Sequence, residues 1–329
     1  MEYRRLGNSG LKVSEIGLGG NNWGGRVAEE LAITIINQAL EIGINFLDTA
    51  ALYVQGRSEE VIGKAVRGKR SQVIIATKFG HPSHESSSEQ GGSRSSIMKS
   101  VDASLKRLNT DYIDLYYMHH PDPVTPVEET LRTLDDLIRT GKVRYIGYSN
   151  CTAWQLCDAL WTSRINSLPA FIAVQEVYSL LDRSAERELI PCCEAHGAGF
   201  VAYAPLASGF LTGKYRRGHE IPAGTRLSRP EQHHSHIMTD ANYDKLASIE
   251  TFAKERGRNV GEVAIAWLLC HPWFGSVIPG ASNIDQLSAN VVATAWKLTE
   301  DEINQLGSYV PLLRPYYPRP QLSDPVYLA

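Results

Sequence analysis

An alternation of short β-rich runs with amphipathic segments extends through most of the chain and restricts its fold more than any other feature. Each run is rich in aliphatic and aromatic residues and ends in a polar or glycine-containing segment, which predicts a strand. The predicted strands are Val13 to Gly19, Ile44 to Ala50, Val73 to Lys78, Tyr112 to His119, Val143 to Asn150, Phe171 to Tyr178, Gly199 to Leu206 and Val277 to Ser282. The predicted helices are Ala28 to Ile42, Ser58 to Arg67, Ser95 to Leu108, Pro126 to Thr140, Thr152 to Trp161, Ala185 to His196, Tyr243 to Arg256 and Val260 to Cys270.

Eight parallel strands with intervening helices are typical of an α/β fold, the (β/α)8 TIM barrel, whose sites lie at the C-terminal face. A doubly wound open sheet is the competing architecture. Gly17-Leu18-Gly19-Gly20 follows a strand, but it is not the GxGxxG pattern that dinucleotide-binding open sheets carry. We therefore expect one barrel domain over residues 1–329, with a proline-rich tail over 311–329.

Two polar segments follow the third and seventh predicted strands. They are His81 to Arg94 and Ser208 to Asp240. Segments after the strands of a barrel lie on the face that holds the active site. We expect both to shape substrate access.

Composition excludes several classes of function. The net charge is −3, so no broad basic surface is available for nucleic acid or anionic lipid. The chain has neither a signal-like N-terminus nor an apolar run long enough to span a membrane, and we expect a cytoplasmic protein. Five cysteines without a CxxC pair predict reduced thiols rather than disulfides or a zinc ribbon. The oligomeric state is left open.

Four ionisable residues fall at or just after the predicted strand ends: Asp48, Tyr53, Lys78 and His119. They suit the reduction of a carbonyl, in which charge develops on oxygen and a proton must be supplied. An ammonium at Lys78 lowers the pKa of Tyr53, and Asp48 keeps that ammonium charged. A neutral His119 orients the carbonyl by a hydrogen bond. His120 is adjacent to His119, and strand alternation lets only one of them face inward without saying which.

Motifs along the chain extend this pattern. They are Tyr3-Arg4-Arg5-Leu6-Gly7, Asp48-Thr49-Ala50 with Tyr53, Ser58-Glu59 and Gly63, Lys78, Tyr112-Ile113-Asp114-Leu115, His119-x-Pro121, and Ile146-Gly147-Tyr148-Ser149-Asn150. Together they resemble the aldo-keto reductase superfamily over nearly the whole chain. The branch most similar contains bacterial oxidoreductases and the β subunits of voltage-gated potassium channels.

The resemblance assigns the histidine role to His119. His120 then stands where many members have tryptophan, which implies a more polar substrate pocket. The same resemblance implies that Trp23 and Phe79 wall this pocket.

The resemblance also implies bound NADP(H) across the barrel mouth. The residues that match cofactor-binding positions are Ser149, Asn150, Gln175, Tyr203, Pro205, Leu206, Ser208, Gly209, Gly280, Ser282, Gln286 and Asn290. Many members place an arginine between Ser282 and Gln286, and this chain does not. Lys214 and Arg226 match basic positions of the channel-subunit branch and would meet the 2′-phosphate. We expect NADP(H), with NAD(H) as a weaker alternative.

No metal is expected. His233, His234 and His236 have a spacing that suits a metal, but they lie in a polar segment without cysteine or a carboxylate pattern and are interpreted as solvated. Cys192 and Cys193 are interpreted as helix residues that pack in the core.

Three hypotheses of function remain. The first is an enzyme that reduces a small-molecule aldehyde or ketone, with a sugar-derived or other hydroxylated carbonyl as the expected substrate. The second is a cofactor-sensing regulatory subunit similar to the channel β subunits. The enzyme is favoured because the chain begins at the barrel, without an extension for a partner. The third is a hydrolase or isomerase built on the same barrel.

Overall fold

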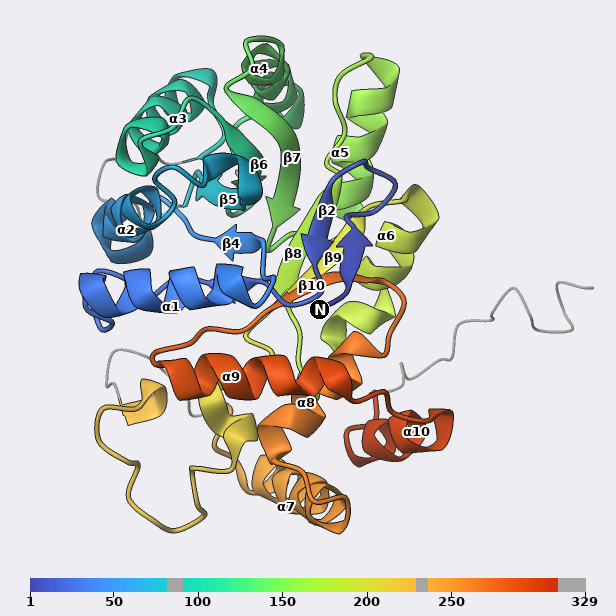
Figure 1. Cartoon of the computed structure of the whole chain (residues 1–329). Coiled ribbons are helices and arrows are strands. Elements are labelled where there is room, and N and C mark those ends of the chain that lie inside the picture. The colour runs from blue at the N-terminus through green and yellow to red at the C-terminus, as the bar shows by residue number, and fades with distance from the viewer. Residues whose placement is uncertain (82–90, 229–235, 313–329) are drawn as a thin grey trace, which may run out of the picture.

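A computed structural model describes residues 1–81, 91–228 and 236–312. Its centre is a sheet of eight parallel strands, each beside its neighbours in sequence (Figure 1). The strands are β3 (Leu18–Gly19), β4 (Phe46–Asp48), β5 (Ile74–Phe79), β6 (Ile113–Met118), β7 (Val143–Ser149), β8 (Ala173–Val177), β9 (Gly199–Tyr203) and β10 (Phe274–Ile278). Residues 82–90 of the predicted access segment, His233, His234 and residues 313–329 of the proline-rich tail lie outside the described residues.

Backbone contacts between the first and last strands close this sheet. Parallel bridges pair Ile16 with Val277 and Gly19 with Gly280. The Gly19 amide also donates to the Pro279 carbonyl at 3.1 Å. A closed sheet with strands in sequence order confirms the predicted (β/α)8 barrel.

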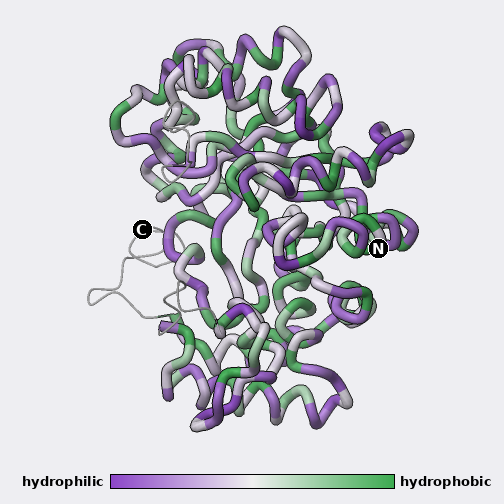
Figure 2. Tube along the Cα trace, turned by 90° about the vertical axis from the view of Figure 1, so that its left-hand side faces the viewer, coloured by the Kyte–Doolittle hydropathy of each residue, from purple (hydrophilic) through white to green (hydrophobic). Residues whose placement is uncertain are grey.

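Helices surround the barrel. They are α1 (Glu29–Glu41), α2 (Arg57–Ala65), α3 (Arg94–Leu108), α4 (Val127–Arg139), α5 (Ala153–Ile165), α6 (Leu189–His196), α7 (Asp240–Glu255), α8 (Val260–Leu269), α9 (Ile284–Val292) and α10 (Glu300–Tyr309). Hydrophilic and hydrophobic residues alternate along many of these helices, as expected for helices with one face against a core (Figure 2). Among the helices of the described residues, none combines the length and the apolar character that crossing a membrane requires.

The first predicted strand divides into two elements. Lys12–Ser14 forms β2, which pairs antiparallel with β1 (Tyr3–Arg5), and only β3 enters the barrel. The two polar residues Ser14 and Glu15 interrupt the alternation between the two pieces, and this break marks where the strand divides. The hairpin contributes Leu6 and Val13 to the core inside the barrel, where they pack with Phe46 and Leu115.

The last predicted strand is displaced. It was expected from Val277 to Ser282, whereas β10 ends at Ile278. Pro279 has no N–H and cannot extend the parallel pairing. Helix α10 was not predicted, although Thr299 and Glu302 form a capping box that signals a helix start.

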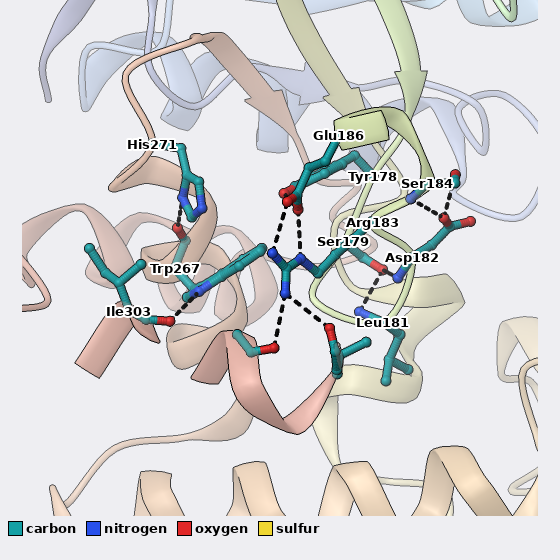
Figure 3. A network of polar contacts seen from close by, with 12 residues as sticks. Tyr178, Ser179, Leu181, Asp182, Arg183, Ser184, Glu186, Trp267, His271 and Ile303 are labelled. Carbon is teal, nitrogen blue, oxygen red and sulfur yellow. Dashed lines mark hydrogen bonds and ion pairs between the residues drawn. The ribbon is translucent and has the colours of Figure 1, made fainter. Parts of the chain in front are cut away.

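A buried polar network fastens α10 to the segment after β8 (Figure 3). Arg183 Nη1 donates to the carbonyls of Gly307 and Val310 at 2.9 Å each. Its Nε donates to Glu186 Oε1 at 2.6 Å, and Tyr178 Oη donates to the same carboxylate. Arg183 therefore satisfies the last carbonyls of α10 and neutralises a largely buried carboxylate.

Arg183→Met should lower the free energy of unfolding by about 2–3 kcal/mol, because it leaves the Glu186 carboxylate without its positive partner and two carbonyls without their donor. Denaturation in urea would measure the change. Arg139→Met is the matched control, since Arg139 is 74% exposed and forms its ion pair among the described residues with Asp135, and its effect should stay below about 0.5 kcal/mol. Equal effects of the two substitutions would contradict this account.

Candidate active site

Asp48 and Lys78 form an ion pair at the mouth of the barrel. Asp48 is the last residue of β4, and Lys78 lies near the end of β5. Lys78 Nζ is 2.6 Å from Asp48 Oδ1, and the side chains of Lys78 and Asp48 are 1% and 2% exposed. The ammonium also donates to the Thr49 carbonyl at 2.8 Å and to Tyr53 Oη at 3.4 Å. Each of its three N–H donors therefore has an acceptor.

The surroundings keep Lys78 charged. Burial alone lowers the pKa of Lys78, but the Asp48 carboxylate and the Tyr53 hydroxyl favour the ammonium more strongly, and the pKa is raised. Gln175 Nε2 donates to Asp48 Oδ2 at 2.7 Å, so both carboxylate oxygens are held. Gln175 thus holds the carboxylate of the ion pair. Its predicted contact with a cofactor stays a prediction.

Tyr53 begins a 3-10 turn, η1 (Tyr53–Gly56), in the segment after β4, which ends at Asp48. Its ring centroid lies 5.0 Å from Lys78 Nζ. Burial raises the pKa of Tyr53, while Lys78 acts in the opposite direction by favouring the phenolate. The sequence predicted a net lowering. That expectation was wrong in sign because burial, which the sequence does not reveal, outweighs the ammonium in this structure.

His119 follows β6 and lies edge-on to Tyr53, with ring centroids 5.9 Å apart. Its amide donates to the Phe79 carbonyl at 2.9 Å, and its carbonyl accepts from Asn150 Nδ2 at 2.8 Å. Burial and the nearby Lys78 charge hold the pKa of His119 well below its usual value. The imidazole is therefore neutral at neutral pH and carries one N–H donor.

A cluster of three imidazoles forms beside Tyr53, consisting of His81, His119 and His120. Their ligand nitrogens lie within 4.8 Å of one another, and His119 stacks on His120 with centroids 5.3 Å apart. The expectation that only one of the two adjacent histidines faces the site was wrong. Strand β6 ends at Met118, so the alternation that separates neighbouring side chains no longer applies. The positive charge of Lys78 disfavours protonation of His119 in this cluster.

His81 was missed by the sequence analysis as a site residue. It lies three positions after Lys78 and just beyond the end of β5. Its ring is edge-on to His119 and His120, with centroids 4.8 Å and 4.7 Å away. The available signal was its position after a strand that already carries an ionisable residue.

The two aromatic residues predicted as pocket walls are buried. Phe79 packs against Tyr116 with centroids 4.8 Å apart, within the core between barrel and helices. Because Lys78 faces the barrel interior, the next residue of the strand faces outward, and this placement differs from the prediction. Trp23 is fully buried in the same core.

Several predicted cofactor residues form one hydrogen-bonded group. Asn150 has a left-handed backbone, with φ of 55°, just after β7. Its side chain donates to Ser149 Oγ at 3.1 Å and accepts from Tyr203 Oη at 2.8 Å. The structure thus brings residues of β7 and β9 together with His119 of the β6 end.

The remaining predicted cofactor residues lie after β9 and β10. Pro205 and Leu206 directly precede the turn η5 (Ala207–Thr212), and Ser208 and Gly209 lie within it. After β10, the Ser282 amide donates to Gln286 Oε1 at 2.8 Å, and Asn290 Nδ2 donates to the Gly280 carbonyl at 3.4 Å. Ser282 and Gln286 thus lie at the start of α9, and Asn290, near the other end of this helix, contacts the backbone of Gly280.

The two basic residues predicted to recognise a phosphate lie in the segment after β9. An added Cβ at Gly209 would lie only 2.8 Å from Lys214 Nζ, so glycine leaves space for the ammonium beside this backbone. Arg226 begins η6 (Arg226–Ser228), and its charge acts weakly against the burial that raises the pKa of Tyr53. Lys214 therefore lies beside the turn after β9, and Arg226 lies near enough to Tyr53 for its charge to be felt there.

Comparisons with known proteins show the family to which the chain belongs. A model of the Aldo/keto reductase family matches residues 15–310. A probable voltage-gated potassium channel subunit beta of Oryza sativa is 35% identical over 300 residues, 89% of this chain and 91% of the relative. Versiconal hemiacetal acetate reductase of Aspergillus parasiticus is 36% identical over 345 residues, 94% and 98% of the two chains. L-glyceraldehyde 3-phosphate reductase of Escherichia coli is 34% identical over 305 residues, 89% and 87%.

The family match covers the barrel from the segment before β3 to the end of α10, and it includes every residue of the Asp48, Tyr53, Lys78 and His119 group. The resemblance stated from the sequence motifs is confirmed. The chain belongs to the Aldo/keto reductase family, a family of oxidoreductases.

Proposed function

We propose that this protein reduces an aldehyde or ketone to an alcohol with NADP(H), with NAD(H) as a weaker alternative. The observation that carries the proposal is the position of Lys78 Nζ, within hydrogen-bond distance of both Asp48 and Tyr53. A neutral imidazole at His119 lies edge-on to the phenol ring. A proton donor, a fixed positive charge and a neutral hydrogen-bond donor thus meet at one place.

Tyr53 acts as the general acid. Its raised pKa keeps the phenol protonated at neutral pH, so the proton is available when charge develops on the carbonyl oxygen. After transfer, the Lys78 ammonium stabilises the phenolate that remains. Asp48 and the Thr49 carbonyl hold Lys78 in place, and Gln175 holds Asp48. Lys78 is therefore a stabilising charge that does not itself need to lose a proton.

His119 orients the substrate. In its neutral form one ring N–H donates a hydrogen bond to the carbonyl oxygen and polarises it. Hydrogen bonds to Phe79 and from Asn150 hold the backbone of His119 at the barrel mouth. The donors at His119 and Tyr53 then converge on the same oxygen.

The residues around the mouth suit a nicotinamide cofactor. Ser149, Asn150 and Tyr203 form a polar edge beside His119, and the space beside Gly209 accommodates the Lys214 ammonium. The start of α9 offers a helix N-terminus of the kind that binds phosphate groups. When bound, the reduced nicotinamide supplies a hydride to the carbonyl carbon.

We further propose a polar, hydroxylated carbonyl compound as the substrate. His81 and His120 add imidazole groups that hydrogen-bond to hydroxyls beside the reacting carbonyl. The similarity to a protein named L-glyceraldehyde 3-phosphate reductase supports a hydroxylated aldehyde.

A cofactor-sensing regulatory subunit is the second candidate. It is supported by relatives named as probable voltage-gated potassium channel β subunits in Oryza sativa and Arabidopsis thaliana. Such a role would use the same mouth to bind the cofactor, with slow or no turnover.

Titration with NADPH and NADH, followed by turnover of glyceraldehyde and of an aromatic aldehyde, tests the proposal. Binding is followed by quenching of protein fluorescence, and turnover by loss of NADPH absorbance. Tight NADPH binding with turnover is the expected result. Binding without turnover would favour the regulatory subunit, and failure to bind either nucleotide would refute both.

Tyr53→Phe should lower kcat for reduction by about 10²–10⁴-fold, because the substitution removes the proton that stabilises the developing oxyanion. NADPH affinity should change little. Tyr3→Phe is the matched control. Tyr3 lies in the N-terminal hairpin and its hydroxyl donates to the Gly43 carbonyl, so its loss should leave kcat unchanged. Full activity of Tyr53→Phe would reject Tyr53 as the acid.

Replacing Lys214 and Arg226 together by alanine should weaken NADPH binding about 10–100-fold and NADH binding much less, because only NADPH carries the 2′-phosphate. Fluorescence titration gives both affinities. The control replaces Arg216 and Arg217, whose partners are Glu250 and Asp244, and should spare both nucleotides. Equal weakening of NADPH and NADH would show that Lys214 and Arg226 do not recognise the phosphate.

A further inference from the structure

A second group of metal-ligating side chains lies outside the barrel, between α5 and α6. Cys157 Sγ is 3.1 Å from Cys192 Sγ and 3.7 Å from His196 Nε2. All three ligand atoms lie within 4.8 Å of one another. Helices α5 and α6 pack side by side at this point (Figure 1). None of the three residues takes part in the proposed reduction.

The helix geometry explains the convergence. Cys192 and His196 are four residues apart on α6 and therefore lie on the same helix face. Cys157 faces them from α5, and the Cys192 thiol also contacts the Ala153 carbonyl of that helix at 3.7 Å. Cys193, the next residue on α6, points elsewhere and is buried in the core. The prediction of core packing is thus confirmed for Cys193, whereas Cys192 also faces Cys157 and His196.

The spacing is close to that of a tetrahedral site. Zinc bonds of about 2.3 Å to sulfur and about 2.0–2.1 Å to nitrogen place tetrahedral ligands about 3.5–3.8 Å apart. The distance between Cys157 Sγ and His196 Nε2 is in this range, and the two sulfur atoms need to separate by only about 0.7 Å. Cys157 and Cys192 are partly exposed, so solvent can exchange an ion.

We propose that Cys157, Cys192 and His196 bind one thiophilic divalent cation of the zinc class. The two thiols release their protons to solvent and bind as thiolates, the imidazole binds through Nε2, and water fills the fourth position on the exposed side of His196. The ion links α5 to α6. Because the site shares no residue with the barrel mouth, metal binding and the proposed reduction can be tested independently.

Cobalt(II) is the probe, because thiolate ligands give it a charge-transfer band and tetrahedral geometry gives intense visible absorption. The full-length protein is kept reduced, freed of metal and titrated with Co²⁺, after which Zn²⁺ is added as a competitor. We expect one thiolate-bound Co²⁺ per chain, displaced by one Zn²⁺. Cys157→Ser and Cys192→Ser should abolish the thiolate band, and His196→Gln should weaken binding by about 10–100-fold or more.

Matched controls separate this site from other thiols and histidines. Cys270→Ser removes another partly exposed thiol, and His219→Gln removes another exposed histidine, and both should bind Co²⁺ as the unaltered chain does. The imidazole cluster at the barrel mouth contains no sulfur and gives no thiolate band. Zn²⁺ should also raise the Tm of the unaltered protein but not that of Cys192→Ser. Absence of the thiolate band, or its retention in Cys157→Ser, would overturn the proposal.

Discussion

The buried ion pair between Asp48 and Lys78 is the interaction on which the arrangement of the mouth depends. Two charges removed from water cost several kcal/mol each unless close geometry and further hydrogen bonds compensate them. Here Gln175, the Thr49 carbonyl and Tyr53 supply those hydrogen bonds. The pair comes from adjacent strands, so its geometry is set by the register between β4 and β5, which aligns Asp48 with Ala76.

The same register logic extends around the mouth. Lys78 is aligned with Tyr117 of β6, and Ser149 of β7 with Gln175 of β8. Hydrogen bonds then connect the strand ends, because Asn150 donates to the His119 carbonyl and accepts from the Tyr203 hydroxyl. A shift of one residue in any of these strands would turn its side chains to the outer layer, where Phe79 lies. The proposed reaction thus depends on barrel closure as much as on the reacting residues.

The outer layer has its own chemistry. The contact of Cys157 with Cys192 and His196 joins two helices whose main role is to cover the strands. These residues lie where α5 and α6 contact each other, at the edge of the core that the helices form against the strands. One fold can therefore carry a proposed reaction at the strand ends and a proposed metal site between helices without either constraining the other.

The sequence by itself determined the barrel and the members of the candidate site. The alternation of strands and helices predicted the eight-stranded architecture, and the strand-end positions identified Asp48, Tyr53, Lys78 and His119, because local periodicity reports which face each residue occupies. Only the tertiary structure decided that Leu6 and Val13 fill the barrel, that His81 lies against His119 and His120, and that burial raises the pKa of Tyr53. These features arise from contacts between residues distant in sequence and from the depth of burial, and periodicity along the chain carries neither.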